Sequence, residues 1–358
     1  MKKNILVVDD SALMRSMLCD IIETDSRFSV EDTAKNGRDA LDLIMKKHSS
    51  YDVILMDINM PYMDGLEVLK RMRQNHIHNR VIIISSLTKN DDGRYTIRAL
   101  ELGAMDFIAK PESYVQIRNE KFRNEVIQSL CMACGVNHET KHSVIKRHTV
   151  RHEEKNENRV YGGGKIVALA CSTGGPKALK EVIPRLSADI AAPVMVVQHM
   201  PQGFTKPLAE RLDGISAIKV KEAQEGEVLK NGVVYIAPGG IHMILENRSG
   251  KHVIAFSDAP PREGVKPCAN IMYESLDGKG FEEIVCVVLT GMGADGTKGI
   301  RKLESKNKIH VIAQNEKTSV VYGMPKAIAE AGLADEILPL GDIAKAIIKN
   351  TGVLNNGR

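Results

Sequence analysis

Short apolar runs alternate with stretches of helical spacing along most of the chain. In the first part, β-rich apolar runs are separated by segments such as Ala12–Ile22 and Leu66–Gln74, whose apolar residues recur at the period of a helix. Five such alternations predict a parallel sheet covered by helices on both faces. The expected strands are Ile5–Val8, Phe28–Thr33, Val53–Met56, Val81–Ile84 and Phe107–Ala109.

The alternation resumes after three glycines, Gly162–Gly164. Two neighbouring runs, Met243–Glu246 and Val253–Ser257, flank Asn247–Gly250 and predict an antiparallel hairpin. The remaining pattern predicts a doubly wound, mainly parallel α/β unit. The expected strands are Ile166–Ala170, Val194–Gln198, Ile218–Lys221, Val233–Ala237, Ile284–Leu289, Val311–Ala313 and Glu336–Leu338. The expected helices are Lys177–Arg185, Lys206–Leu212, Asn270–Leu276, Thr297–Ser305, Pro325–Ala331 and Ile343–Asn350.

The segment between these two units has a different composition. Ser113–Leu130 keeps helical spacing, but the chain after Gly135 is polar and charged, with few residues able to build a core. We therefore expect a first domain over 1–130, a solvated linker over 131–164 and a second domain over 165–350.

The start of this linker carries residue types that bind zinc. Cys131, Cys134, His138 and His142 have the spacing C-x2-C-x3-H-x3-H. On one straight helix they would form a stripe about 16 Å long, too long to surround one ion, unless Gly135 breaks the helix. The gap between the two pairs is also shorter than in the usual zinc pattern, so incidental composition is the favoured interpretation.

Composition and charge argue against several classes of protein. The 358 residues include 43% hydrophobic residues, enough for ordinary cores, and the net charge of +4 is too small for a typical nucleic-acid binder. No apolar run reaches the length of a membrane span, and residues 1–10 lack a signal-peptide pattern. We therefore expect a cytoplasmic protein, not inserted in a membrane, whose six cysteines are free thiols.

Polar residues stand at the ends of the strands expected in the first domain. Asp9 and Asp10 follow the first strand, Asp57 the third, Ser85 the fourth and Lys110 the fifth. These side chains converge at the carboxyl edge of a parallel sheet, where three crowded carboxylates favour a hard cation such as Mg²⁺. Helix capping would explain one aspartate, but it does not explain all five positions.

Four ordered motifs run through this domain: V-D-D-S near the start, M-D-I-N-M-P-Y-M-D-G, S-S-L-T and A-K-P. Together they resemble the receiver domain of bacterial response regulators, a flavodoxin-like (βα)5 fold. The resemblance implies that Asp57 accepts a phosphoryl group from a histidine kinase. The implied Mg²⁺ ligands are Asp9, Asp10, Asp57 and the backbone carbonyl of Asn59, and the implied phosphate-sensing residues are Ser85, Lys110 and Phe107.

Three strand ends of the second domain carry groups that suggest catalysis. They are Ser172-Thr173-Gly174-Gly175, Gln198-His199-Met200-Pro201 and the loop Thr290–Gly296, which contains Asp295. Taken singly, each has a structural explanation as a turn or a satisfied polar group. Their joint position at one sheet edge favours a nucleophile, a general base and an orienting carboxylate. The chain order is not that of α/β-hydrolases, and Ala170 stands where a nucleophile elbow needs glycine.

Five further motifs in order are A-C-S-T-G-G-P, Q-H-M-P-Q-G-F-T, A-P-G-G-I-H-M, L-T-G-M-G-A-D-G and V-V-Y-G-M-P. They resemble the catalytic domain of the protein-glutamate methylesterase family of bacterial chemotaxis. The implied roles are Ser172 as nucleophile, His199 as base and Asp295 as orienting acid, with backbone N–H groups of Thr173 and Met292 as the oxyanion hole. Lys266-Pro267-Cys268-Ala269-Asn270 departs from the more usual Arg-Pro-Ser-Val-Asp, which leaves the role of this segment open.

The two resemblances imply one function. We expect a phosphorylation-activated serine esterase that hydrolyses glutamate methyl esters on chemoreceptors, its substrate, with Mg²⁺ needed for receiver phosphorylation and no cofactor for the esterase. Whether it also deamidates receptor glutamines stays open, because ester and amide hydrolysis pass through similar tetrahedral intermediates. We also expect the unphosphorylated receiver to pack over the Ser172 edge. The alternatives are a phosphorylation-controlled transcription factor and a non-catalytic adaptor that binds an anion.

Overall fold

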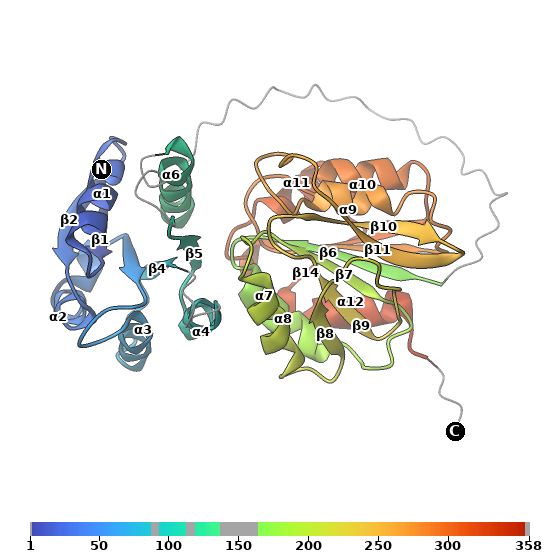
Figure 1. The fold of residues 1–358 in the computed structure, drawn as a ribbon, viewed down its shortest axis with the longest axis horizontal. Coiled ribbons are helices and arrows are strands. Elements are labelled where there is room, and N and C mark those ends of the chain that lie inside the picture. The colour runs from blue at the N-terminus through green and yellow to red at the C-terminus, as the bar shows by residue number, and fades with distance from the viewer. Residues whose placement is uncertain (1, 87–92, 112–118, 137–163, 355–358) are drawn as a thin grey trace.

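The N-terminal domain is built on a five-stranded parallel sheet with the strand order β2-β1-β3-β4-β5 (Figure 1). The structure is a computed structural model that describes residues 2–86, 93–111, 119–136 and 164–354. The strands are β1 (Lys3–Val8), β2 (Phe28–Ala34), β3 (Val53–Asp57), β4 (Arg80–Ser85) and β5 (Asp106–Ala109). The helices are α1 (Ala12–Glu23), α2 (Gly37–Lys47), α3 (Gly65–Gln74), α4 (Arg94–Leu102) and α6 (Glu120–Cys134), with a 3-10 turn at His48–Ser50.

Local sequence explains where these elements begin. Every residue of β3 is buried, as expected for a strand covered on both faces. Ser11, Asn36 and Asp64 cap α1, α2 and α3, each accepting a hydrogen bond from a backbone N–H of the first turn. The five expected strands are confirmed, with ends that differ by at most two residues.

Helix α6 differs from the helix expected at Ser113–Leu130. Asn119 caps it, so it begins at Glu120, and it continues to Cys134, inside the segment expected to be linker. Residues 112–118 lie outside the described residues. Cys131 is buried in the apolar core that α1 and α6 form against the sheet, which gives this cysteine a structural role. His138 and His142 of the zinc pattern also lie outside the described residues.

The C-terminal domain contains a seven-stranded parallel sheet with the order β14-β13-β12-β6-β7-β9-β8 and a separate hairpin, β10-β11. The doubly wound α/β prediction is therefore confirmed. The strands are β6 (Ile166–Cys171), β7 (Val194–Gln198), β8 (Lys219–Glu222), β9 (Val233–Ile236), β10 (His242–Arg248), β11 (Lys251–Ser257), β12 (Ile284–Val288), β13 (Ile309–Gln314) and β14 (Glu336–Leu338). The helices are α7 (Gly175–Val182), α8 (Thr205–Asp213), α9 (Ala269–Ser275), α10 (Thr297–Glu304), α11 (Met324–Glu330) and α12 (Leu340–Thr351), with 3-10 turns at Ile183–Arg185 and Glu316–Thr318.

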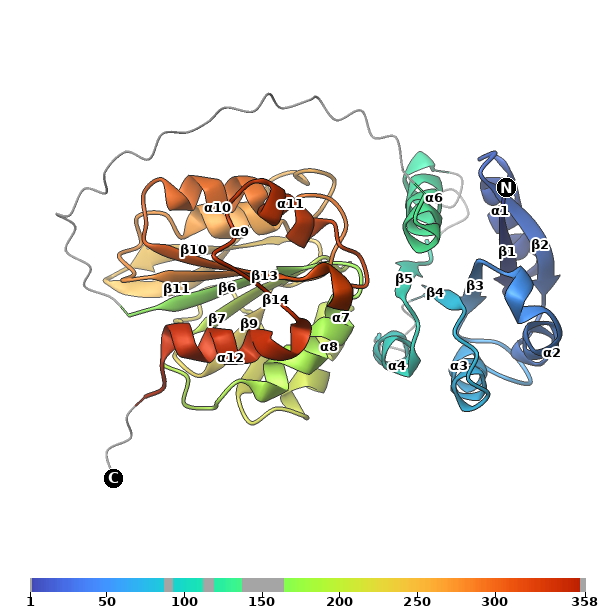
Figure 2. The ribbon, with the colours of Figure 1, turned by 180° about the vertical axis from the view of Figure 1, so that it is seen from behind.

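Two layers cover this sheet. Helices α7, α8 and α12 pack on one face, and α9, α10, α11 and the hairpin pack on the other (Figures 1 and 2). The hairpin turn is shorter than expected, because Arg248 pairs with Lys251 and only Ser249 and Gly250 connect the strands. No helix in the described ranges is long and apolar enough to cross a membrane.

The strand order marks one edge of the sheet as a binding position. The first strand, β6, lies in the middle, with β7 on one side and β12 on the other, so the chain winds outwards in both directions from it. Ligands of doubly wound sheets bind beyond the carboxyl ends of the strands at such a switch point. The loops that follow β6, β7 and β12 are therefore the expected place for the chemistry.

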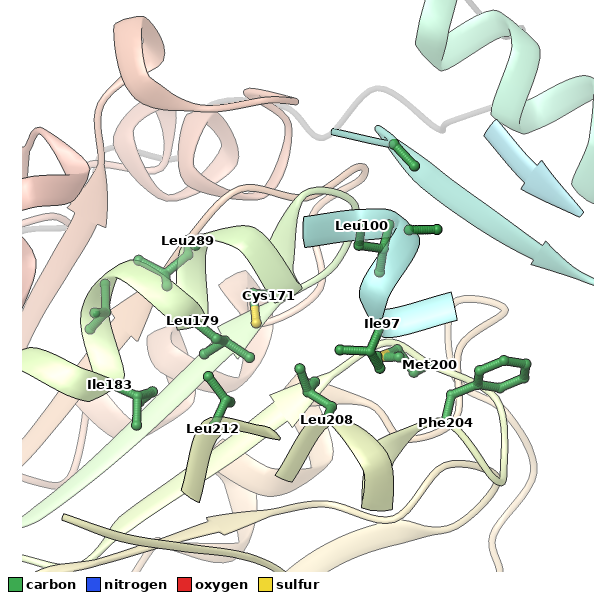
Figure 3. Packing of buried hydrophobic residues seen from close by; sticks show 14 of the residues in the cluster. Ile97, Leu100, Cys171, Leu179, Ile183, Met200, Phe204, Leu208, Leu212 and Leu289 are labelled. Atoms are coloured by element: carbon green, nitrogen blue, oxygen red, sulfur yellow. The ribbon is translucent and has the colours of Figure 1, made fainter. Parts of the chain in front are cut away.

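The two domains pack against each other through α4 on one side and α7 and α8 on the other. Figure 3 shows Ile97 of α4 pointing towards Leu208 of α8, with Leu100 of α4 and Leu212 of α8 in the same cluster. These side chains belong to one continuous cluster of buried apolar residues that spans both domains. The apolar contact between the domains is therefore part of the hydrophobic core rather than a loose surface contact.

Candidate active site

The turn that carries Ser172 is held by close backbone approaches. Ser172 N donates a hydrogen bond to Thr290 O at 3.0 Å, which ties the loop after β6 to the loop after β12. Gly174 has a left-handed φ of 75° and opens α7. A Cβ on Gly291 would lie 2.8 Å from Ser172 Cβ, so only glycine permits this approach.

His199 directly follows β7, which lies beside β6 on the side opposite β12. Its backbone N–H donates to Cys171 O at 3.1 Å, and its imidazole is largely buried, with Nε2 2.8 Å from Asp295 Oδ2. Because Asp295 occupies Nε2, Nδ1 is the nitrogen that remains to act as a base. Within the described residues no hydrogen bond joins Ser172 Oγ to the imidazole, and such catalytic bonds often tighten only when substrate binds.

The carboxylate of Asp295 is buried and surrounded by donors. Its Oδ1 accepts from Asn270 N at 2.8 Å, Gly296 N at 2.9 Å and Cys268 Sγ at 3.1 Å. Its Oδ2 accepts from Ala269 N at 2.6 Å as well as from His199. Although burial acts to raise it, the hydrogen bonds and the nearby imidazole lower the pKa of Asp295 to about 2. The group is therefore an ionised carboxylate at neutral pH, as an orienting acid requires.

This arrangement also locates the atypical segment. Three of the five residues in Lys266–Asn270 donate hydrogen bonds to the Asp295 carboxylate, so the segment holds this carboxylate in place. The side chain of Asn270 accepts hydrogen bonds from Gly296 N at 3.1 Å and Gly299 N at 2.7 Å, which fixes the loop that carries Asp295.

Gln198 links the loops that carry Ser172 and His199, a role that the sequence analysis did not assign to it. Its Nε2 donates to Ser172 O at 3.0 Å and to His199 O at 3.2 Å, so one amide connects the two catalytic loops. Its Oε1 accepts from Cys171 Sγ at 3.0 Å. The signal in the sequence that could have pointed to Gln198 is its position as the last and polar residue of an otherwise apolar strand.

Two residues are expected to form the oxyanion hole. Thr173 lies in the loop after β6, next to Ser172, and Met292 lies in the loop after β12. Thr173 is buried, and its carbonyl accepts from Thr290 Oγ1 at 2.9 Å. Met292 is half-buried and lies between Gly291 and the left-handed Gly293. The fold thus brings both residues to the edge that carries Ser172.

A second polar cluster stands at the carboxyl edge of the N-terminal sheet. One oxygen from each of Asp9, Asp10 and Asp57 lies within 4.8 Å of the others. Lys110 Nζ lies 2.6 Å from Asp57 Oδ2 and 2.8 Å from Asp9 Oδ2. Burial raises the pKa of Asp57 to about 6, against the lowering effect of Lys110. The hard oxygen donors fit a Mg²⁺ ion, which would relieve this crowding.

The two expected sensor positions are linked to the domain interface. Ser85 is buried, and its Oγ accepts a hydrogen bond from Thr96 Oγ1 of α4 at 2.7 Å. The ring of Phe107 packs against Phe204 of the C-terminal domain with ring centroids 4.6 Å apart. Both positions therefore contact structures that form the interface.

The N-terminal domain contacts each of the three loops that carry the candidate catalytic residues. Thr173 Oγ1, beside the nucleophile, donates to Asp106 Oδ2 at 2.6 Å. Phe204, in the segment after His199, packs against Phe107, and the Met292 sulfur lies 3.7 Å from Gln128 Nε2 of α6. Figures 1 and 2 show α4, β5 and α6 facing the C-terminal domain.

An ion-pair cluster reinforces this packing. Glu101 of α4 lies 2.7 Å from Arg211 Nε, 3.1 Å from Lys180 Nζ and 2.9 Å from an Arg98 nitrogen. Although burial opposes the shift, these three cations lower the pKa of Glu101 to about 2. A cleft of about 570 Å³ lies beside this cluster, between α3 and α4 and helices α7 and α8, and none of the triad residues lines it.

Comparison with known proteins shows the family of each domain. The CheB methylesterase family matches residues 167–347, and the response regulator receiver domain matches residues 5–120. A protein-glutamate methylesterase/protein-glutamine glutaminase of Geobacillus kaustophilus is 42% identical over 97% of this chain and 98% of its own length. The protein of the same name from Bacillus subtilis is 40% identical over 96% and 97%.

Among solved structures, the catalytic domain of a Thermotoga maritima CheB methylesterase is similar. It is 43% identical, with a TM-score of 0.51, over 52% of this chain and 99% of that domain. The chain therefore belongs to the CheB methylesterase family, with a response regulator receiver domain in front of the methylesterase domain.

Proposed function

We propose that this protein is a phosphorylation-controlled serine esterase that removes methyl groups from glutamate side chains of chemoreceptors and deamidates receptor glutamines. The observation that carries the proposal is the 2.8 Å contact between His199 Nε2 and the ionised Asp295, at the sheet edge that bears Ser172. The double name of the curated relatives, protein-glutamate methylesterase/protein-glutamine glutaminase, supports both reactions.

The proposed reaction begins with attack of Ser172 Oγ on the ester carbonyl while His199 Nδ1 takes the hydroxyl proton. The backbone N–H groups of Thr173 and Met292 stabilise the tetrahedral oxyanion. The imidazolium, held by Asp295, gives its proton to the departing methoxide, and methanol leaves. Water then attacks the acyl-enzyme with His199 as base and releases the glutamate carboxylate. With an amide substrate, ammonia departs instead of methanol.

This scheme uses only groups of the chain, and so we propose no cofactor for the esterase reaction. The receiver domain has a different requirement. Its Asp57 carboxylate accepts the phosphoryl group from a chemotaxis histidine kinase. Asp9, Asp10, Asp57 and the Asn59 carbonyl are the proposed ligands of Mg²⁺, which when bound offsets the negative charge of the transferring group. Lys110 pairs with the phosphate, and its pKa is raised, despite burial, by Asp57 and Asp9.

Control follows from the interface. In the closed arrangement the receiver contacts Thr173, Phe204 and Met292 and restricts access to the catalytic edge. Phosphate on Asp57 draws the Ser85 hydroxyl away from Thr96, which loosens α4 and shifts the equilibrium towards an open site.

The organisation that we propose is a receiver over residues 1–130, a linker over 131–164 and a catalytic domain over 165–350. The chemoreceptors and the histidine kinase are its partners, and the cytoplasm is the compartment where it meets them. No role in nucleic-acid binding or direct membrane insertion is proposed. The transcription-factor alternative is not favoured, because residues 167–347 match a methylesterase domain.

A small fluorophosphonate that reacts with activated serines separates an esterase from a non-catalytic adaptor. The full chain should be labelled at Ser172 and become inactive, while Ser172→Ala should stay unlabelled. Labelling at another serine, or none under conditions that open the site, would contradict the proposed function.

A further inference from the structure

The thiol of Cys268 lies against the carboxylate of the triad. Cys268 is buried, its Sγ is 3.1 Å from Asp295 Oδ1, and it stands directly before α9. Its backbone N–H donates to Nδ1 of the buried His242 at 3.1 Å, so the residue is held in place from its other side. The mechanism proposed above makes no use of this thiol.

Cys268 differs in kind from the other donors to Asp295. Three of those are backbone N–H groups, of Ala269, Asn270 and Gly296, and the fourth is the imidazole of His199. Among the described contacts, the thiol is therefore the one side-chain donor to Asp295 that does not itself take part in proton transfer. Burial, and then the negative charge of Asp295, raise the pKa of the Cys268 thiol to about 12, so it keeps its proton at neutral pH.

We propose that Cys268 is a positioning residue that tunes the base of the esterase, by limiting how strongly Asp295 stabilises the protonated His199 imidazole. The inference rests on the proposed function, because it needs His199 to be the base. Each further hydrogen-bond donor to a carboxylate offsets part of its negative charge, so the carboxylate stabilises the imidazolium less. Removing the thiol should strengthen the hold of Asp295 on the imidazolium, so that a higher pH is needed to obtain the neutral base.

The other titratable groups around Asp295 leave this sign unchanged. Four titratable side chains face the carboxylate. They are His199 in the loop after β7, Cys268 in the segment before α9, His242 in β10 and Tyr273 in α9. Burial lowers the pKa of His242 and raises that of Tyr273 well above its ordinary value, so both favour their neutral forms. None of their described hydrogen bonds involves the Cys268 side chain, so we expect their effects to be common to all variants.

The test measures the rate at which a small fluorophosphonate labels Ser172 as a function of pH. It uses the full chain as wild type, Cys268→Ala and Cys268→Ser, with Cys286→Ala as a matched control. Cys286 is a similarly buried cysteine, in β12, and its thiol is not among the described hydrogen-bond donors to Asp295. A thermal unfolding midpoint for each variant separates loss of fold from loss of reactivity.

We expect the acidic limb of the Cys268→Ala profile, where the rate rises with pH, to move to higher pH by roughly half a unit. Two or three backbone N–H donors together lower a carboxylate pKa by about two units, and a thiol is a weaker donor than a backbone N–H. Cys268→Ser should restore the limb or move it to lower pH, because a hydroxyl is the stronger donor. Cys286→Ala should follow wild type.

Two results would overturn this inference and leave the proposed function standing. One is a Cys268→Ala limb that coincides with wild type, including a rate that falls by the same factor at every pH. The other is an equal movement in Cys286→Ala. A wild-type chain that is never labelled at Ser172 would instead overturn the proposed function, and the inference with it.

Discussion

Thr173 Oγ1 donates a hydrogen bond to Asp106 Oδ2 across the domain interface, at 2.6 Å. Thr173 directly follows Ser172, the proposed nucleophile, and Asp106 begins β5, the strand that leads to Lys110 of the proposed phosphoacceptor site. One strand of four residues therefore separates the two proposed sites of the protein. A change of charge at Asp57 has a short route to the residue beside Ser172.

Replacing Glu101 by glutamine should raise the basal esterase activity of the unphosphorylated chain. The substitution removes the negative charge that Lys180 and Arg211 share across the interface. We expect an increase of about three- to tenfold, since partly exposed pairs contribute modestly. Methanol release without phosphodonor is the measurement. Glu67→Gln is the matched control, because Glu67 pairs with Arg71 inside α3. Equal basal rates in Glu101→Gln and wild type would contradict the proposed occlusion.

The closed state should tighten as the pH falls. Burial raises the pKa of Asp106 to about 6, so above that pH the closed state holds an unfavourable charge, and below it the proton relieves the cost. Glu101, with its pKa lowered to about 2, stays ionised throughout and contributes no change. The basal activity of wild type relative to Asp106→Ala should therefore fall as pH decreases from about 7.5 to about 5.5. The His199 limb is common to both proteins, so a constant ratio would refute this linkage.

Thr96→Val should make the receiver easier to activate. The Ser85 hydroxyl accepts a hydrogen bond from Thr96, and in the proposed switch it moves away from this partner towards the phosphate on Asp57. Valine keeps the shape and removes the competing partner, which should lower the phosphodonor concentration for half-maximal activation by about fivefold. Titration with a small phosphodonor and Mg²⁺ measures this. Ser85→Ala should respond weakly at any concentration, and unchanged titrations for both variants would exclude this route.

Gly291→Ala should impair catalysis while the fold is retained. Its Cβ would lie 2.8 Å from Ser172 Cβ and 2.4 Å from the Met324 sulfur, which forces the nucleophile to move. A displacement of about 1 Å at a reacting group costs on the order of a hundredfold in rate. Gly341→Ala is the control, since its nearest neighbour would be 3.5 Å away. Comparable activity in the two variants would argue against a tightly fixed Ser172.

The sequence alone predicted both sheets and most positions of the candidate site, because parallel strands place their carboxyl ends together and the polar residues stood at those ends. Element ends were less certain. The start of α6 depends on a cap at Asn119, which the apolar spacing of Ser113–Leu130 does not reveal.

The sequence did not predict contacts between residues that lie far apart in the chain. Asp106 lies one residue before the strand expected at Phe107–Ala109, and only the packing of the two domains places it against Thr173. Cys268 and Asn270 appeared as departures from a family pattern, and their contacts with Asp295 and its loop required the fold.

Methanol release from a methylated chemoreceptor, with a small phosphodonor and Mg²⁺ present, tests the central claim most directly. Wild type should release methanol, and Ser172→Ala should lower the rate by about 10⁴-fold or more while keeping its unfolding midpoint. Near-normal methanol release by Ser172→Ala would contradict the account.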